Sequence, residues 1–212
     1  MKQEITIAVL GGGGRTGKYL VNKLIARGFQ IKLLLRKPEE FQINSSLIEI
    51  FKGDATDSEA IQNSVQGCHA VISTVGQRPG EPLVASKAVT NVLEAMNKSG
   101  INRFISLAGI NIDTPFDKKG KETSLATEWM KTNFPEIQAD RQKAYSILLA
   151  SELNWTLVRV PLIEFSESSG ELAVNLEDCP GNKICAGNIA DFLVAQLADE
   201  TYFRKSPFIA NI

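Results

Sequence analysis

The chain has 212 residues, of which 43% are hydrophobic and 22% charged, and its formal net charge is −1. This length and composition suit one globular α/β domain with a full core. The dispersed, nearly balanced charge argues against nucleic acid or an anionic membrane as the main partner, and no apolar run approaches the roughly 20 residues of a membrane span. The start MKQE is unlike a signal peptide and the three cysteines form no CxxC pair, so we expect a reduced, cytoplasmic protein.

Apolar runs typical of strands alternate along the chain with helical patterns. The predicted strands are 4–10, 30–36, 47–52, 69–75, 102–107 and 154–160. Helical patterns follow the first strand as far as Gly28, continue from 83 to Gly100, and recur at 136–151 and 188–199. This alternation predicts a single-domain, doubly wound Rossmann fold over 1–212, with a mostly parallel sheet and helices on both faces. Long irregular stretches are predicted at 109–124 and 161–183. Because both follow strands, we expect them to form a small substrate-side region at the carboxyl edge of the sheet.

Residues 5–20, ITIAVLGGGGRTGKYL, place four glycines between the first strand and the first helix. Helix N-termini attract phosphate, and glycine lets the backbone approach a pyrophosphate closely. Two spacings fit: Gly12, Gly14 and Gly17 as GxGxxG, and Gly11, Gly14 and Gly17 as GxxGxxG. In this position the pattern predicts dinucleotide binding, and the alternative is a flexible turn.

The end of the second strand bears on the choice of dinucleotide. NAD sites usually place Asp or Glu there to bind the ribose 2′-hydroxyl, but this strand ends in Arg36 and Lys37, with no acid before Glu39. Arg36 can form a charge-assisted fork with a 2′-phosphate, and Arg15 in the glycine loop can assist. The alternative is that Arg36 and Lys37 form a solvated strand end. We therefore favour NADP(H) over NAD(H).

Six segments together resemble a known family: GGGGRTG after the first strand, the basic end of the second strand, GDATD at 53–57, VISTVG at 71–76, RFISLAG at 103–109 and NWTLVRVP at 154–161. They resemble the atypical branch of the short-chain dehydrogenase/reductase superfamily. Within it, the chain is most similar to the small NAD(P)H-binding members of the NmrA-like and biliverdin/flavin-reductase-like type. The resemblance covers nearly the whole chain and is specific for fold and cofactor, much less so for substrate.

The resemblance implies a role for individual residues along the cofactor. The pyrophosphate loop would contain Gly11, Gly14, Arg15, Thr16 and Gly17. Arg36 would face the adenosine 2′-phosphate, Asp54 and Ala55 would border the adenine, and the ribose would lie along Thr74, Val75 and Gly76. Ser106 would lie near the nicotinamide. The alternatives are a turn residue for Asp54 and a buried hydroxyl bonded to backbone for Ser106.

The chain departs from the wider superfamily in its catalytic pair. Most catalytic members use Tyr-x-x-x-Lys, in which the lysine lowers the tyrosine pKa and the tyrosine relays a proton. Tyr19 and Lys23 have this spacing, but they lie on the first helix, away from the nicotinamide end. The helix at 136–151 offers Lys143 and Tyr145 instead. Lys143 either holds the nicotinamide ribose or is solvated, and Tyr145 either faces the pocket or packs in the core.

The missing pair favours a planar redox acceptor such as a flavin, a quinone or a conjugated tetrapyrrole. In such acceptors charge spreads over a π-system, and solvent can supply the proton. His69, the only histidine, is expected at the surface, and no metal site is predicted. Seven further residues could contact an acceptor, but a core or solvated position is favoured for each: Phe116, Trp129, Phe134 and Phe165 for stacking, and Lys118, Lys119 and Lys121 for a flavin phosphate.

Two functions therefore compete. The first is an NADPH-dependent oxidoreductase that transfers hydride to a planar acceptor such as a flavin or quinone. The second is a non-catalytic NADP(H)-sensing regulatory protein of the NmrA-like type, acting through a protein partner. A sugar-nucleotide epimerase or dehydratase is disfavoured, because such enzymes need a larger C-terminal substrate domain and generally the missing tyrosine.

Overall fold

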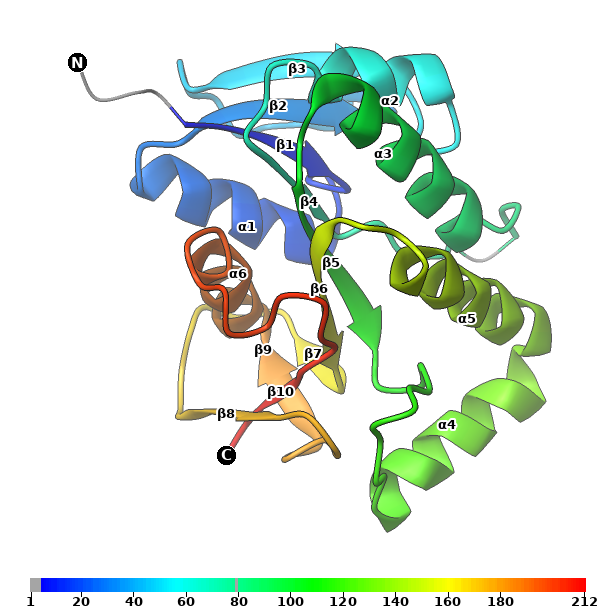
Figure 1. Ribbon diagram of the computed structural model, residues 1–212. Coiled ribbons are helices and arrows are strands. Elements are labelled where there is room, and N and C mark those ends of the chain that lie inside the picture. Colours follow the sequence, from blue (N-terminus) through cyan, green and yellow to red (C-terminus); the bar gives the residue numbers. More distant parts are fainter. Residues whose placement is uncertain (1–4, 79) are drawn as a thin grey trace.

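A computed structural model describes residues 5–78 and 80–212 (Figure 1). Its main sheet has the strand order β3-β2-β1-β4-β5-β6-β10-β8, and neighbouring strands are parallel except for β8, which is antiparallel to β10. The strands of this sheet are β1 (Thr6–Leu10), β2 (Gln30–Leu35), β3 (Ile48–Lys52), β4 (Ala70–Ser73), β5 (Arg103–Gly109), β6 (Asn154–Val160), β8 (Leu172–Asn175) and β10 (Phe208–Asn211). A separate parallel pair contains β7 (Leu162–Glu164) and β9 (Lys183–Cys185).

Helices cover both faces of the main sheet. They are α1 (Arg15–Ala26), α2 (Ser58–Val65), α3 (Ala85–Ser99), α4 (Lys121–Asn133), α5 (Pro135–Leu149) and α6 (Ala186–Ala195), with a 3₁₀ turn η1 (Pro38–Glu40) after β2. The helices α2, α3 and α5 contribute to one core layer, and α1 and α6 contribute to the other. The predicted doubly wound fold with a mostly parallel sheet is therefore confirmed.

Strand β1 shows why the predicted strands are continuously apolar. Ile7 and Val9 pack in the layer beneath α1 and α6, whereas Ala8 and Leu10 pack in the layer beneath α2, α3 and α5. Successive strand residues face opposite sides of a sheet, so a strand covered on both faces needs an apolar residue at every position. This burial fixes the carboxyl ends of the strands, from which the site is built.

The structure differs from the sequence-based expectation after β5. The stretch 161–183, expected to be irregular, contains β7 and β8, and the end of 109–124 lies inside α4. Helix α4 buries only Thr123 and Thr127, so its buried positions carry no apolar periodicity that could reveal it. Helix α2 was also not predicted, although the Asp57 side chain accepts hydrogen bonds from the first helical N–H groups, as an N-cap residue should.

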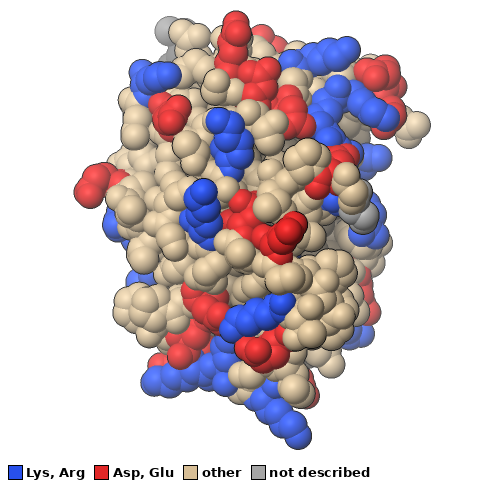
Figure 2. Space-filling view, turned by 90° about the vertical axis from the view of Figure 1, so that its right-hand side faces the viewer, with Lys and Arg blue, Asp and Glu red and all other residues tan. Residues whose placement is uncertain are grey.

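The face that contains α3, α5 and α4 carries mixed charge. Figure 2 shows this face, over which Lys and Arg side chains are interspersed with Asp and Glu side chains. In the part of the chain that the structure describes, no helix has the length and apolar character required to cross a bilayer.

Candidate functional site

A cleft of about 990 Å³ follows the carboxyl edge of the sheet from the end of β2 to α5. It includes the point between β1 and β4 where the strand order reverses, which is where open α/β sheets bind ligands. The structure brings thirteen of the fourteen predicted site residues to this cleft: Gly11, Gly14, Arg15, Thr16, Gly17, Arg36, Asp54, Ala55, Thr74, Val75, Gly76, Ser106 and Tyr145.

The glycine loop after β1 has positions that only glycine can occupy without rearrangement. Gly11 has a φ of 78°, and a Cβ there would lie 2.7 Å from the carbonyl carbon of Thr74. A Cβ on Gly17 would collide with the backbone of Gly11 and Gly12. Gly12 instead packs against core side chains of β2 and α1 and is absent from the cleft lining. The spacing that borders the cleft is therefore Gly11, Gly14 and Gly17.

The N-terminus of α1 suits a phosphate. Gly14 occupies the N-cap, no side chain caps the helix, and the first turn contains no acidic residue. The first N–H groups of a helix lack partners within it and carry the positive end of the dipole. Arg15 and Lys18 add positive charge to the lining, and the Arg15 guanidinium lies 4.1 Å from the centroid of the Phe165 ring. With the space left by the glycines, these groups fit a dinucleotide pyrophosphate.

Beyond the glycine loop, where the cleft reaches the end of β2, Arg36 is paired with acidic side chains. Its Nη1 and Nη2 atoms donate to the two carboxylate oxygens of Glu81, at 2.7 and 3.2 Å. Its Nε lies 3.6 Å from Oδ2 of Asp54, and Arg78 lies 3.8 Å from Glu81. The fork that the sequence assigns to a 2′-phosphate is thus already formed with Glu81. Glu81 carries no sequence signal of this role, because it lies on the loop between β4 and α3, far from the fingerprint positions.

Asp54 and Thr74 both serve local structure at the cleft. Oδ1 of Asp54 accepts from the backbone N–H and the hydroxyl of Thr56, at 2.8 and 2.7 Å, so this oxygen stabilises a turn. Its Oδ2 stays on the Arg36 side. The N–H of Thr74 donates to the carbonyl of Leu10 at 2.9 Å, which continues the pairing of β4 with β1 up to the glycine loop.

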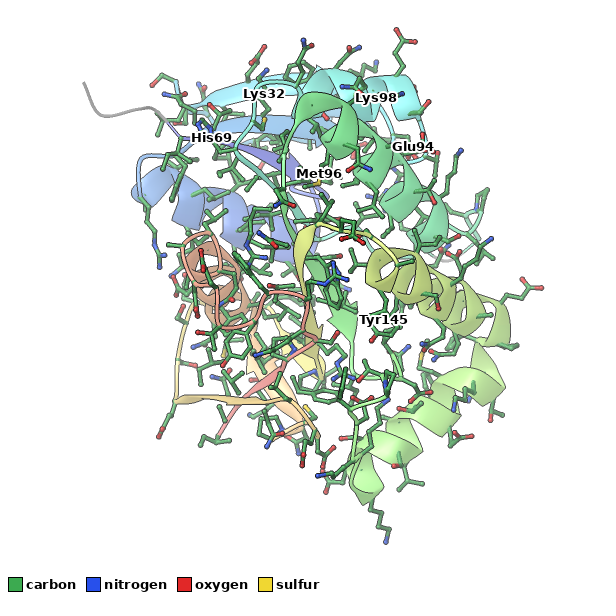
Figure 3. All side chains as sticks on the ribbon, in the orientation of Figure 1. Lys32, His69, Glu94, Met96, Lys98 and Tyr145 are labelled. Carbon is green, nitrogen blue, oxygen red and sulfur yellow. The ribbon has the colours of Figure 1, made fainter. Side chains whose placement is uncertain are left out.

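Ser106 and Tyr145 occupy the half of the cleft nearer β5 and α5. Ser106 lines the cleft on β5, and its hydroxyl makes no hydrogen bond to another of the described residues. Tyr145, labelled in Figure 3, also lines the cleft. Its ring packs edge-to-face on Trp155, with ring centroids 6.3 Å apart. Burial raises the pKa of the Tyr145 hydroxyl, which lies close to Ser206 in the core. Tyr145 therefore lines the cleft, while its hydroxyl lies near Ser206 and Arg159, which are absent from the cleft lining.

The structure corrects the assignment of Lys143. Lys143 is exposed and lies outside the cleft lining, whereas Arg141 lies within it. Arg141 and Tyr145 are four residues apart on α5 and share a face, and Lys143 lies between them on another face. The four-residue spacing from Tyr145, which places both side chains on one face of a helix, could have identified Arg141 from the sequence. Burial lowers the pKa of the Arg141 guanidinium.

Most of the other acceptor contacts considered from sequence lie elsewhere. Phe165 lines the cleft, but Phe116, Trp129 and Phe134 are exposed and absent from its lining. The three lysines are also absent: Lys118 pairs with Glu177, the Lys119 side chain is 8% exposed and pairs with Asp113 and Asp117, and Lys121 is exposed at the start of α4.

His69 is exposed at the opposite end of the sheet, where its Nδ1 accepts from the N–H of Thr6 (Figure 3). Within residues 5–78 and 80–212, no group of three or more His, Cys, Asp or Glu side chains is arranged to hold a metal ion.

Solved structures of similar fold are numerous. An oxidoreductase from Lactococcus lactis has a TM-score of 0.80 at 20% identity, covering 98% of this chain and 91% of that one. A short-chain dehydrogenase/reductase from Veillonella parvula, solved in complex with NADP, has a TM-score of 0.79 at 16% identity, covering 98% and 94%. An anaerobillin reductase from Escherichia coli O157:H7 has a TM-score of 0.79 at 18% identity and covers 97% of each chain. These likenesses establish the fold.

Comparison with related sequences identifies the family of this chain. An uncharacterized chloroplastic protein of Arabidopsis thaliana is 26% identical over 210 residues, which is 94% of this chain and 72% of that protein. A cinnamoyl-CoA reductase of Medicago truncatula is 30% identical over 117 residues, covering 50% of this chain and only 35% of the reductase. The profile of the NAD(P)H-binding family matches residues 11–200, from the glycine loop to beyond α6. That span is most of the chain, so the protein belongs to the NAD(P)H-binding family.

Proposed function

We propose that this protein is an NADPH-dependent oxidoreductase that reduces a planar acceptor such as a flavin or a quinone. The observation that carries the proposal is the composition of the cleft beyond the glycine loop. There the lining from β5, α5 and β6 onward is mostly apolar, and the notable polar side chains are Ser106, Asp140 and Arg141. A mostly apolar pocket with a few placed polar groups suits a flat, conjugated ligand.

Different residues along the cleft would bind different parts of the cofactor and the acceptor. The glycine loop and the first turn of α1 would bind the pyrophosphate, and Arg36 would bind the 2′-phosphate once Glu81 releases it. When bound, the reduced nicotinamide supplies a hydride. The Ser106 hydroxyl is available to hydrogen-bond at the nicotinamide end. The apolar walls around it exclude water from the acceptor.

The arrangement of Tyr145 favours an acceptor that needs no proton relay from the protein. Its hydroxyl lies close to Ser206, and four residues further along α5 stands Leu149 in place of a lysine. Reduction of a simple ketone needs a positioned acid for the developing alkoxide. A flavin or quinone delocalises the added charge and can take its proton from solvent. The similarity to proteins named as reductases also supports reductase chemistry.

The test is to titrate the purified protein with NADPH and NADH and then to follow the absorbance of the reduced nicotinamide with FMN, riboflavin or menadione present. We expect NADPH oxidation that depends on the acceptor and exceeds the rate without protein. Variant Gly17→Val, which blocks the loop, serves as the control that must abolish both binding and turnover. Tight NADPH binding with a flat trace for every acceptor would refute the reductase.

The second candidate is an NADP(H)-sensing regulatory protein without turnover. The same Tyr145 geometry favours it, since no tyrosine–lysine relay is assembled among the described residues of α5. This candidate predicts tight binding with a flat trace, together with a protein partner whose retention on the immobilised chain changes when NADPH is added. Steady turnover with any acceptor would rule it out.

A further inference from the structure

Arg141 is a cation in the cleft that the structure leaves without a partner. It is half-buried, lines the cleft from α5, and forms no hydrogen bond or ion pair with another side chain or backbone group in the described parts of the chain. A guanidinium has five donors and remains charged, and leaving it partly buried without an acceptor is costly. A group with this geometry suits a carboxylate or phosphate that arrives with a ligand.

The nearest acid does not neutralise it. Asp140 precedes Arg141, but one carboxylate oxygen of Asp140 accepts from the N–H of Ala85 at 2.8 Å, and the other accepts from the N–H and hydroxyl of Ser86. Asp140 therefore caps the first turn of α3 and ties that helix to α5. The other acids in the lining, Glu40, Asp54 and Glu81, lie at the adenosine end beside Arg36 and Lys37.

The surroundings hold Arg141 in place. Residues before and after it on α5 bind the loop that follows β5: Gln138 bonds to the side chain and carbonyl of Asn111, and Gln142 bonds to the N–H and carbonyl of Asp113 at 3.0 and 2.8 Å. A Cβ on Gly109, at the end of β5, would lie 4.0 Å from Nη1 of Arg141. The bonds of Gln138 and Gln142 thus fix this part of α5 against the loop after β5, and the Arg141 guanidinium lies beside the end of β5, where the nicotinamide half of a dinucleotide would lie.

The anion that Arg141 suits belongs to the acceptor and not to the cofactor. The order β1-β4-β5 puts the end of β5 two strands from the glycine loop, roughly 10 Å away at the usual strand spacing. The phosphates of a dinucleotide bound at the loop and at Arg36 would lie on the other side of that gap. The nicotinamide riboside beyond the pyrophosphate carries no anionic group.

We propose that Arg141 forms an anion subsite that binds a carboxylate or phosphate carried by the planar acceptor. The inference rests on the proposed function and narrows its substrate class from planar acceptors in general to planar acceptors with an anionic substituent. Two matched pairs of acceptors separate the two anions. FMN differs from riboflavin by its phosphate, and biliverdin differs from its dimethyl ester by its two carboxylates.

The first experiment measures kcat/KM with NADPH for all four acceptors in the wild type, Arg141→Met and Lys143→Met. We expect Arg141→Met to lower kcat/KM about ten- to a hundredfold, through KM, for the anionic member of at least one pair, and to leave its uncharged partner within about twofold. Lys143→Met removes the same charge two residues away and outside the cleft, so it should leave all four values unchanged. Equal losses within both pairs, or no loss at all, would overturn the subsite.

The second experiment does not depend on turnover. FMN and riboflavin are titrated into each variant with saturating NADP⁺, with flavin fluorescence as the signal, and NADPH binding and thermal unfolding are measured in parallel. Tighter binding of FMN than of riboflavin that Arg141→Met abolishes and Arg141→Lys partly retains would support the subsite, even if no acceptor is reduced and the oxidoreductase proposal fails. Weaker NADPH binding by Arg141→Met would overturn the subsite. Equal affinities for the two flavins, together with equal affinities for biliverdin and its dimethyl ester followed by biliverdin absorbance, would also overturn it. If Arg141→Met does not fold, Arg141→Lys decides by the same comparison.

Discussion

The ion pair between Arg36 and Glu81 makes a quantitative prediction about cofactor choice. Replacing the carboxylate with the neutral amide in Glu81→Gln should strengthen NADPH binding and leave NADH binding unimproved. The reason is that a 2′-phosphate must take the same two guanidinium N–H groups that now donate to Glu81, at 2.7 and 3.2 Å. Whatever free energy the existing pair contributes is subtracted from the affinity for the phosphate.

The magnitude follows from exposure. The Arg36 and Glu81 side chains are 35% and 42% exposed, so their pair is of the solvent-screened kind, worth about 0.2–1 kcal/mol. Removing it should therefore lower the NADPH Kd by about 1.5- to 5-fold. The gain should shrink at high salt, because the Debye length falls from about 10 Å at 0.1 M to about 3 Å at 1 M.

The assay is a fluorescence titration of NADPH and NADH at low and high salt. Glu40→Gln is the matched control, because Glu40 also lines the cleft but pairs with Lys37 at 2.6 Å and has no contact with Arg36 in the described structure. The reasoning is refuted if Glu81→Gln leaves NADPH affinity unchanged, if NADH gains equally, or if Glu40→Gln produces the same gain.

Four further outcomes are expected. Gly11→Ala should lower the Tm by roughly 2–8 °C, since its φ of 78° costs a non-glycine residue about 1–2 kcal/mol before the contact with Thr74; Gly13→Ala, where a Cβ would meet only the Leu35 side chain at 3.0 Å, should have less effect in the same thermal scan. Asp140→Ala should destabilise the fold by about 0.5–2 kcal/mol in urea unfolding, because it removes the side chain that caps α3, and an unchanged midpoint would contradict that role. Tyr145→Phe should keep flavin reduction within about threefold of the wild type, and a loss of about a hundredfold or more would mean that its hydroxyl relays a proton. Cys68, whose thiol pKa burial raises to about 11, should resist iodoacetamide at pH 8 in the native protein and react after unfolding, as peptide mass spectrometry would show.

Much of the fold was predictable because its core strands are buried on both faces. The six predicted strands correspond to β1 to β6, and Gly28 and Gly100 follow the helices that they were predicted to end. The strands β7 to β10 were not predicted. Strands β7 and β8 contain no buried residue, so they lack the continuous apolar run that made the equally short β4 predictable, and β9 and β10 have only three and four residues. Helix α4 was missed for a different reason: Leu125 and Trp129 on it are 61% and 56% exposed, which is the reverse of the usual pattern.

The cofactor half of the site was more predictable than the acceptor half. Gly11, Gly14 and Gly17 follow from a motif of fixed spacing, and the structure adds which of the two spacings borders the cleft. The residues of the acceptor half depend on which face of α5 meets the end of β5. The sequence predicts the helix but not which face it turns toward β5. Lys143 and Arg141 are two residues apart, so their side chains point in directions about 200° apart around the axis of α5, since each residue advances by about 100°. The rotation of α5 about this axis is fixed by tertiary contacts: Tyr145 packs on Trp155, Asp140 accepts from the first turn of α3, and Gln138 bonds to the loop after β5.

Two properties of the acceptor half point to the same substrate class. Leu149 stands four residues after Tyr145 in place of a lysine, so α5 contains no tyrosine–lysine relay, and the proposed acceptor would have to stabilise its own added charge. The Arg141 guanidinium has no partner in the described structure, so the proposed acceptor would also have to satisfy this cation. A small ketone does neither, whereas a neutral quinone meets the first requirement alone. A conjugated ring system with a carboxylate or phosphate arm meets both, and its arm can bind Arg141 without involving the reacting atoms.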